Sequence, residues 1–197
     1  MGAVVAAAAS AGRLRRFLIG CAATVITLAA VCPRASALPH VASRPFALTL
    51  RQRAFLDTLE ERTFHYFWDL SDPRTGLTPD RHPTKSFVSV GATGFALTAY
   101  PIGVERGYVR RSQAGERVLT TLRFLWQAPQ DTARAGSTGY RGFFYHFLDP
   151  ATGRRFETVE LSTMDTALLL AGALFCQSYF DRPDPRESSI RAYAESL

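Results

Sequence analysis

The sequence predicts an all-α fold built of helical hairpins, of the type called an α/α toroid. An apolar segment rich in small residues is followed by an amphipathic segment, and this order occurs twice. The two apolar segments contain residues 93–97 and 166–170, which lie 73 residues apart. Apolar helices on the inside and amphipathic helices on the outside build such a toroid. The connections into the apolar segments are long and those out of them are short, so the elaborate loops should gather at one end.

Residues 1–37 have the pattern of a secretory signal peptide. Arg13, Arg15 and Arg16 precede an apolar run over residues 17–32, and Ala-Ser-Ala at 35–37 forms a small-residue cleavage signature. The apolar run is too short for a comfortable membrane span, so we expect no stable span once the signal is cleaved. The mature protein is therefore expected to be exported, either to the periplasm or out of the cell.

The basic character of the chain lies largely in this N-terminal segment. The formal net charge of +6 falls to +2 without residues 1–37, because four arginines and no acids are removed. We therefore expect no nucleic-acid partner, because a net positive charge was the main feature in favour of one. Of the three cysteines only Cys176 remains, inside an apolar segment, which indicates a buried small hydrophobic side chain. No cluster of His and Cys has the spacing of metal ligands, and we expect neither a metal nor a cofactor.

The first helix of the mature chain is predicted by its cap. Residues 38–49 contain two prolines and are expected to be a linker. Thr49 and Gln52 have capping-box spacing and open a helix that runs to about Leu70. Its apolar residues fall roughly on one face, so we expect this helix to be peripheral.

Two apolar and two amphipathic helices are predicted to follow. Ser89 begins a helix rich in Gly and Ala, which should lie inside and should kink or end at Pro101. An amphipathic third helix comes next. Ser162 and Asp165 have capping-box spacing for a fourth helix, which is apolar on nearly every side and is therefore expected to be buried. Asp184 then caps a fifth, amphipathic helix.

An aromatic-rich segment near residues 142–156 precedes the fourth helix and is predicted to be a short extended or hairpin segment. Its side chains show a period of two, with Phe143, Tyr145 and Phe147 alternating with Phe144, His146 and Leu148. Residues 149–153 contain Pro and Gly and should turn the chain. Only one face of such a segment can be exposed, so about half of these side chains should pack in the core.

Taken together, several ordered motifs resemble the glucoamylase-like domain that is shared by bacterial endo-β-1,2-glucanases and by part of the cyclic β-1,2-glucan synthases. The resemblance covers about residues 51–180, which is nearly the whole mature chain. The motifs that carry it are residues 64–68, 75–77 with 80–81, 92–98, 103–108, 142–147 and 160–172.

The resemblance implies an (α/α)₆ toroid that acts on β-linked glucan, β-1,2-glucan by this likeness, without a metal or other cofactor. The family's domain is about twice as long as this chain. We therefore expect residues 50–197 to be the N-terminal part of such a domain, with the toroid incomplete, as in a truncated gene product or a partial chain.

Two acids match the motif before and within the fourth helix and are the candidate catalytic residues. Glycoside hydrolysis needs an acid that protonates the leaving oxygen and a second carboxylate that serves as base or nucleophile. A first-turn position favours the ionised form of Asp165, which suits a base or hydroxyl acceptor, and leaves Glu160 as the better acid candidate. The alternatives are that Asp165 is a capping-box residue and Glu160 a solvated loop acid.

Six further residues are candidates for substrate binding, because glycan sites pair flat apolar faces with directed polar groups. Four of them lie in the aromatic segment or just before it, namely Tyr140, Phe144, Tyr145 and His146. Asp80 and Arg81 lie on the other long loop at the same end and could bind hydroxyls. For His146 the alternative is a structural role, and for Asp80 and Arg81 a surface ion pair.

Three functions remain open at this stage. The first is an exported glycoside hydrolase or transglycosylase that acts on β-linked glucan through paired carboxylates. The second is a non-catalytic glycan-binding or envelope-scaffold protein that lacks the catalytic half. The third is a different enzyme on an α/α toroid, such as a polysaccharide lyase, because a fold alone does not fix the chemistry.

Overall fold

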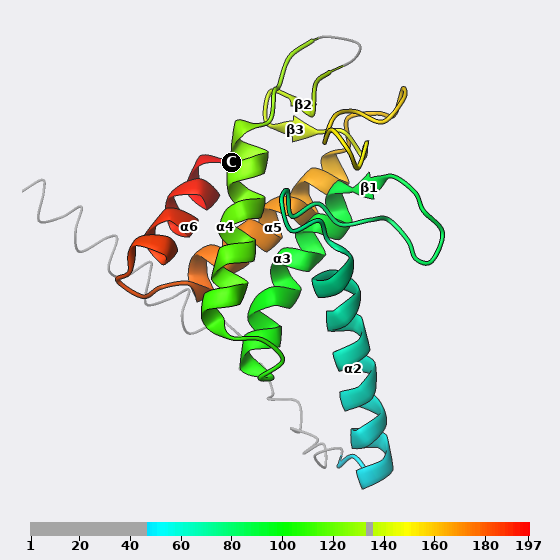
Figure 1. The fold of residues 1–197 in the computed structure, drawn as a ribbon, viewed down its shortest axis with the longest axis vertical. Helices are drawn as coiled ribbons and strands as arrows, with labels where there is room; N and C mark the ends of the chain where they lie inside the picture. Colours follow the sequence, from blue (N-terminus) through cyan, green and yellow to red (C-terminus); the bar gives the residue numbers. More distant parts are fainter. Residues whose placement is uncertain (1–46, 133–135) are drawn as a thin grey trace, which may run out of the picture. The chain divides into compact units, whose positions relative to one another are not determined.

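The computed structural model describes residues 47–132 and 136–197. Within these ranges the helices are α2 (Leu50–Leu70), α3 (Val90–Glu105), α4 (Arg111–Gln127), α5 (Thr163–Tyr179) and α6 (Pro185–Ser196) (Figure 1). The strands have two residues each and are β1 (Val88–Ser89), β2 (Gly139–Tyr140), β3 (Phe143–Phe144) and β4 (Phe147–Leu148). The predicted signal peptide and most of the linker lie outside the described residues. None of the described helices combines the length and the apolar character that a membrane crossing requires.

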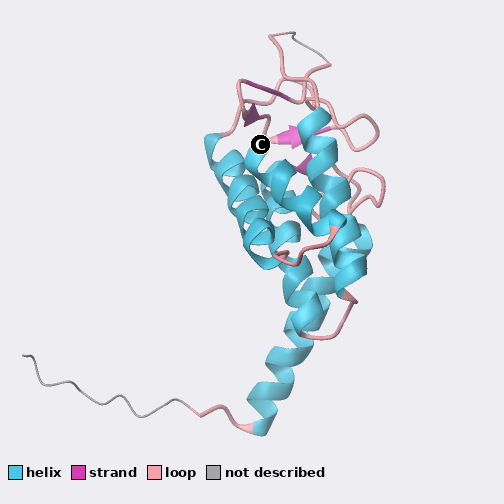
Figure 2. Cartoon of the chain, turned by 90° about the vertical axis from the view of Figure 1, so that its left-hand side faces the viewer, coloured by secondary structure: helices cyan, strands magenta, loops and turns pink. Residues whose placement is uncertain are grey.

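The helices form two layers. Helices α3 and α5 pack directly against each other, and α4 and α6 pack side by side. Helix α4 also packs on α3, and α6 on α5, while α2 contacts α3. Figures 1 and 2 show the long connections gathered at the end where α3 and α5 begin. The predicted all-α fold of helical hairpins, with its loops at one end, is thereby confirmed.

Two glycines allow the inner helices to approach almost to backbone contact. A Cβ atom built at Gly94 of α3 would overlap the backbone of Leu168 in α5. A Cβ atom at Gly172 of α5 would overlap the carbonyl oxygen of Gly94. Any side chain at either position would therefore push the two helices apart.

The predicted internal repeat is visible in the way the inner helices begin. Ser89 and Ser162, also 73 residues apart, cap α3 and α5 by accepting a hydrogen bond from the N–H three residues further on. Thr93 and Thr166 donate their hydroxyls to the carbonyls of these serines, over 2.9 and 2.6 Å. Each threonine Oγ1 also accepts a backbone N–H from the preceding loop, which ties each loop to its inner helix.

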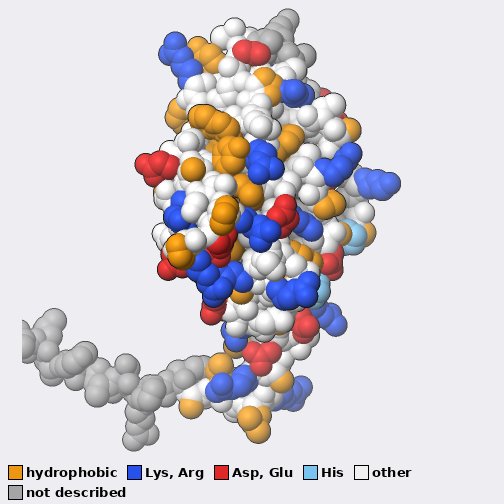
Figure 3. Space-filling model, turned by 60° about the vertical axis from the view of Figure 1, so that its left-hand side comes forward, with side chains coloured by type: hydrophobic (Ala, Val, Ile, Leu, Met, Phe, Trp, Pro, Cys, Tyr) orange, Lys and Arg blue, Asp and Glu red, His pale blue; other side chains and the backbone are white. Residues whose placement is uncertain are grey.

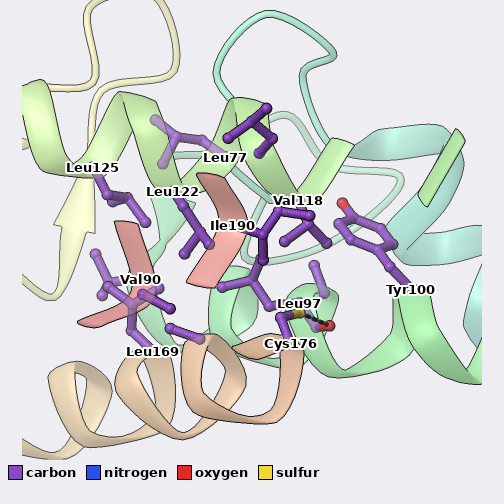
Figure 4. Close-up of a cluster of buried hydrophobic side chains, with 14 of the residues drawn as sticks. Leu77, Val90, Leu97, Tyr100, Val118, Leu122, Leu125, Leu169, Cys176 and Ile190 are labelled. Atoms are coloured by element: carbon purple, nitrogen blue, oxygen red, sulfur yellow. Dashed lines mark hydrogen bonds between the residues drawn. The ribbon is translucent and has the colours of Figure 1, made fainter. Parts of the chain in front are cut away.

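The core lies between the two layers (Figure 4). Cys176 is fully buried there, as predicted, and its burial raises the pKa of the thiol. The Sγ–H donates to the carbonyl of Leu97, 3.0 Å away. That carbonyl is the one left without its helical partner, because Pro101 has no N–H. The helix does not end at Pro101, because α3 continues to Glu105.

The prediction that the fourth helix is buried on nearly every side is wrong. Helix α5 is not buried all round, because Met164, Leu174 and Phe175 are 72%, 53% and 42% exposed. Helix α2 is peripheral, as predicted, and its residues Leu56 and Leu59 line a groove of about 740 Å³ between α2 and α3. An apolar composition shows what a helix can bury and not which faces are covered. Other apolar side chains lie scattered among charged ones on the face drawn in Figure 3.

An ion pair between the half-buried Arg111 and the buried Glu187 joins α4 to α6. Glu187 accepts two hydrogen bonds from the Arg111 guanidinium, at 2.7 and 2.9 Å, and a third from the backbone N–H of Arg182. Arg111 also donates to the carbonyl of Tyr179 at the end of α5. Its hydrogen bond is the largest cause that holds the pKa of Glu187 below its ordinary value.

Replacing Gly172 with Ala should destabilise the fold by about 1–3 kcal/mol, because the added methyl group meets backbone rather than a movable side chain. Urea denaturation measures this loss in the free energy of unfolding. Ser178→Ala, on an exposed position of the same helix, is the control and should change the stability by less than about 0.5 kcal/mol. Equal stability of wild type and Gly172→Ala would contradict the close packing of α3 and α5.

The Glu187 carboxylate should make the stability depend on pH. Its pKa in the folded state lies below the ordinary value of 4.5, so its contribution is present above that pH and is lost as the pH falls through the folded-state pKa. Glu187→Gln should cost about 3–5 kcal/mol at pH 7 and should flatten this acid-side loss, as measured by urea denaturation at several pH values.

The control for Glu187 is Glu116→Gln, which breaks an exposed ion pair with Arg186 and should cost about 1 kcal/mol at most. A Glu187→Gln variant that still lost the same amount of stability in acid would show that other carboxylates cause the loss.

Candidate active site

The two candidate catalytic acids lie on either side of one imidazole. The Nδ1 atom of His146 lies 2.8 Å from Oε1 of Glu160, at hydrogen-bond distance. The Nε2 atom of His146 lies 3.6 Å from Oδ2 of Asp165, at ion-pair distance. The structure thus brings together three of the predicted residues in a carboxylate–imidazole–carboxylate cluster, which we call the His146 cluster.

Backbone hydrogen bonds hold His146 in this position from both sides. Its carbonyl accepts from the N–H of Val90, the first residue of α3, over 3.2 Å. Its N–H donates to the carbonyl of Glu160 over 3.0 Å. The neighbouring strand β4 pairs with β1, with Phe147 opposite Ser89. His146 is therefore fixed between the beginning of α3 and the segment that leads into α5.

Asp165 lies at the junction of both inner helices. It is in the first turn of α5, and a Cβ atom at Gly91 in the first turn of α3 would overlap its Oδ1. The hydroxyl of Ser162 donates to Oδ2 and accepts the N–H of Asp165. The N–H of Ser162 is taken by the carbonyl of Phe144, so the predicted capping box is only half formed. Asp165 therefore acts as a cap partner and also faces His146.

Glu160 is far more accessible than Asp165, with 66% of its side chain exposed against 15%. The pKa of Glu160 lies below its ordinary value, first because of the Glu160 backbone N–H and then because of the His146 hydrogen bond. A lowered pKa favours the ionised carboxylate. This direction is opposite to that of the proton donor for which the sequence favoured Glu160.

A row of aromatic rings runs from the His146 cluster toward the loop of residues 71–87. The imidazole stacks on Phe147 with ring centres 3.8 Å apart, and Phe147 lies 3.9 Å from Phe87. Phe156 lies 5.1 Å from Phe87. All three phenylalanines are half-buried, so each keeps some exposed ring surface. We call these three residues the aromatic row.

Sequence reasoning did not name the aromatic row as part of the site. Phe87 and Phe147 meet because β1 pairs with β4, and strands of two residues leave no periodicity from which that pairing could be found. The one available signal was the position of Phe87 two residues before Ser89, the predicted cap of α3.

Asp80 and Arg81 form the predicted alternative, a surface ion pair with a distance of 2.7 Å. The Arg81 guanidinium also lies over the ring of Phe87, 5.6 Å from its centre. The backbone N–H of Asp80 donates to the carbonyl of Phe87. The pair therefore sits at the end of the aromatic row farthest along the stack from His146.

The other predicted sugar contacts need correction. Phe144 is fully buried and Tyr145 is 7% exposed, so both rings pack in the core. The expected alternation fails because the segment turns between partners, pairing with β2 at Phe144, with Leu161 at Tyr145 and with β1 beyond His146. Tyr140 lies in the β2–β3 hairpin, where the Arg141 guanidinium lies over its ring at 5.3 Å. No contact joins it to the His146 cluster among those we find in the described residues.

Within residues 47–132 and 136–197, no group of three or more His, Cys, Asp or Glu side chains is arranged to hold a metal ion. The His146 cluster contains one imidazole and two carboxylates, and the imidazole contacts both carboxylates. An imidazole between two carboxylates can transfer protons and bind hydroxyls.

The chain is similar to proteins that act on β-1,2-glucan. Over 151 residues it is 28% identical to an exo-β-1,2-glucooligosaccharide sophorohydrolase (non-reducing end) from Parabacteroides distasonis. This match covers 72% of the chain and 19% of that enzyme. An endo-β-1,2-glucanase from Chitinophaga pinensis, solved with sophorotriose and glucose, superposes with a TM-score of 0.61 and 26% identity. This match covers 76% of the chain and 36% of the glucanase.

A Bacteroides uniformis protein solved as a candidate glucoamylase matches with a TM-score of 0.63 and 27% identity, over 76% of the chain and 35% of that protein. The chain thus spans between about a fifth and about a third of the length of these three proteins. No family model matches it. The chain is similar in both sequence and fold to glucoamylase-like and β-1,2-glucan-hydrolysing proteins, which confirms the resemblance predicted from its motifs.

Proposed function

We propose that this chain carries part of the active site of an exported glycoside hydrolase for β-linked glucan, with β-1,2-glucan as substrate. One observation carries the proposal, namely that Glu160 and Asp165 converge on His146 at the end where both inner helices begin. Loops over a rigid helical scaffold are where binding and catalytic residues concentrate. The similarity to hydrolases of β-1,2-glucan supports the choice of substrate.

The two carboxylates suit different tasks in this proposal. Asp165 is largely buried, accepts a hydrogen bond from Ser162, and lies in the first turn of α5, the end of a helix that attracts negative charge. It is the candidate base or hydroxyl acceptor. Glu160 is exposed and can be covered by a sugar. Such covering would remove water from the carboxylate and raise its pKa, which is the direction that a proton donor requires.

The aromatic row and the ion pair beside it supply the binding surface. A pyranose ring has an apolar face that stacks on an aromatic ring, while its hydroxyls need directed polar partners. Phe147 and Phe87 offer such faces next to His146. Asp80 and Arg81 lie beyond Phe87 and can bond hydroxyls of the same glycan chain. We therefore place the glucan along the row from Glu160 toward Arg81.

The function is tested by incubating the purified protein with β-1,2-linked glucose oligosaccharides and measuring the release of reducing ends. Glu160→Gln and Asp165→Asn should each lower the rate by at least about 100-fold, since each removes a group used in proton transfer. Glu157→Gln is the control, because Glu157 is an exposed acid on the same segment with no contact to His146 in the described residues. An active Glu160→Gln variant would refute the assignment.

A second function is favoured by the aromatic row. Its partly exposed rings can hold a glycan by stacking, whether or not the carboxylates cleave it. In that case the protein would be retained on immobilised β-1,2-glucan and would release no reducing ends, and Phe147→Ala would abolish the retention. Unsaturated products that absorb in the ultraviolet would point instead to a lyase.

Export is the third part of the proposal and rests on the pattern of residues 1–37. Expression of the full chain in a bacterial host should yield a protein whose N-terminal sequence begins at Leu38, recovered outside the cytoplasm. A variant in which Arg13, Arg15 and Arg16 are replaced by Glu is the control and should stay uncleaved. Cytoplasmic recovery of both forms at full length would contradict export.

A further inference from the structure

The arrangement of the His146 cluster fixes where its first proton must lie. Glu160 has a lowered pKa, and an ionised carboxylate has no proton to donate. The 2.8 Å contact between Glu160 and Nδ1 therefore requires that Nδ1 carries the hydrogen. In a neutral imidazole the other nitrogen, Nε2, then has only a lone pair.

That lone pair faces Oδ2 of Asp165, an oxygen that already accepts a hydrogen bond. Oδ2 of Asp165 accepts the hydroxyl hydrogen of Ser162, whose own oxygen already accepts the N–H of Asp165. In this arrangement Oδ2 acts as an acceptor, as an oxygen of an ionised carboxylate does. With a neutral ring, a nitrogen lone pair and a carboxylate oxygen would lie 3.6 Å apart and repel each other. A second proton, on Nε2, converts this repulsion into an ion pair.

Other charges near the cluster leave this balance in place. From the segment before α5, Arg155 acts on Glu160 through its charge, but its Nε–H is used by the carbonyl of Val159 and its guanidinium lies over Tyr145. From the loop of residues 71–87, Arg81 reaches the ring of Phe87 and is paired with Asp80. Among the described residues, the charged groups in contact with the imidazole are therefore Glu160 and Asp165.

We propose that His146 is a positioning residue that works as a doubly protonated imidazolium, with one N–H for each carboxylate, so that the spacing of Glu160 and Asp165 depends on the proton on Nε2. Loss of this proton as the pH rises releases Asp165 from the ring while the Glu160 hydrogen bond remains. The link between the proton and the carboxylates rests on the two distances from the imidazole nitrogens, with the lowered pKa of Glu160 in support, whereas its importance for glucan hydrolysis rests on the function proposed above.

The coupling can be measured without any enzymatic activity. In the full chain labelled with ¹³C in Asp and Glu carboxyls and ¹⁵N in His rings, a pH titration by NMR should show a step in the Asp165 carboxyl signal. This step should coincide with the loss of the Nε2 proton of His146. In His146→Gln, an amide that does not titrate replaces the ring, and the step should disappear. The His65–Asp69 pair, at 3.0 Å on α2, is the internal control and should keep its own coupling in both proteins.

Three results would overturn the proposal. The first is an Asp165 signal without a step while His146 titrates, and the second is a step that persists in His146→Gln. The third is a ring of His146 that carries one proton, on Nδ1, at every pH of the titration. If His146→Gln does not fold, the ring signals of His146 in Asp165→Asn decide. Without the negative partner the Nε2 proton should be lost at a lower pH than in the wild type, and an unchanged loss would contradict the proposal.

Where the chain hydrolyses glucan, the pH profile of the rate adds a second test. The wild-type rate should fall on the alkaline side as the Nε2 proton is lost, and His146→Gln should lack this fall. A protein that shows the NMR coupling but no hydrolysis would refute the proposed function and leave the role of His146 standing. Hydrolysis without the coupling would do the reverse.

Discussion

The close approach of α3 and α5 is the constraint on which the rest of the structure depends. Gly94 and Gly172 let the two backbones meet almost in contact. Because the helices are parallel partners of one repeat, their first turns come to lie next to each other. Asp165 then reaches the first turn of α3 at Gly91, and the extended segment with His146 is held between the two helix beginnings.

The repeat also shows where chemistry departs from architecture. Both inner helices use a serine cap and a threonine that binds the loop in front of it. The position three residues after the cap is Ala92 in the first copy and Asp165 in the second. The shared residues build the scaffold twice, while the carboxylate is present once. The site is therefore asymmetric although the helices that carry it are equivalent.

The sequence was a good guide wherever a local rule decides the structure. The capping box of Thr49 and Gln52, the cap at Ser162 and the order of apolar and amphipathic helices could all be predicted, because each depends on neighbours within a few residues. The burial of α5 could not be predicted, since its apolar residues do not show which faces another helix covers. The aromatic row could not be predicted either, because Phe87 and Phe147 meet through strands far apart in sequence.

The acidic pair was predicted from its motif, but the charge state and the surroundings of the two carboxylates depend on contacts that the motif does not show. Nothing in the sequence shows that His146 lies between Glu160 and Asp165, or that the pKa of Glu160 is lowered there. A residue that the sequence suggested as one sugar contact among several is the centre of the cluster.

The Cys176 thiol joins the two inner helices by a hydrogen bond to the carbonyl of Leu97. It takes the acceptor that Pro101 leaves unused at Leu97, so a thiol on one inner helix substitutes for an amide missing from the other. A reagent that modifies thiols can reach this atom only when the two helices separate. The rate at which Cys176 is modified therefore reports how often α3 and α5 separate.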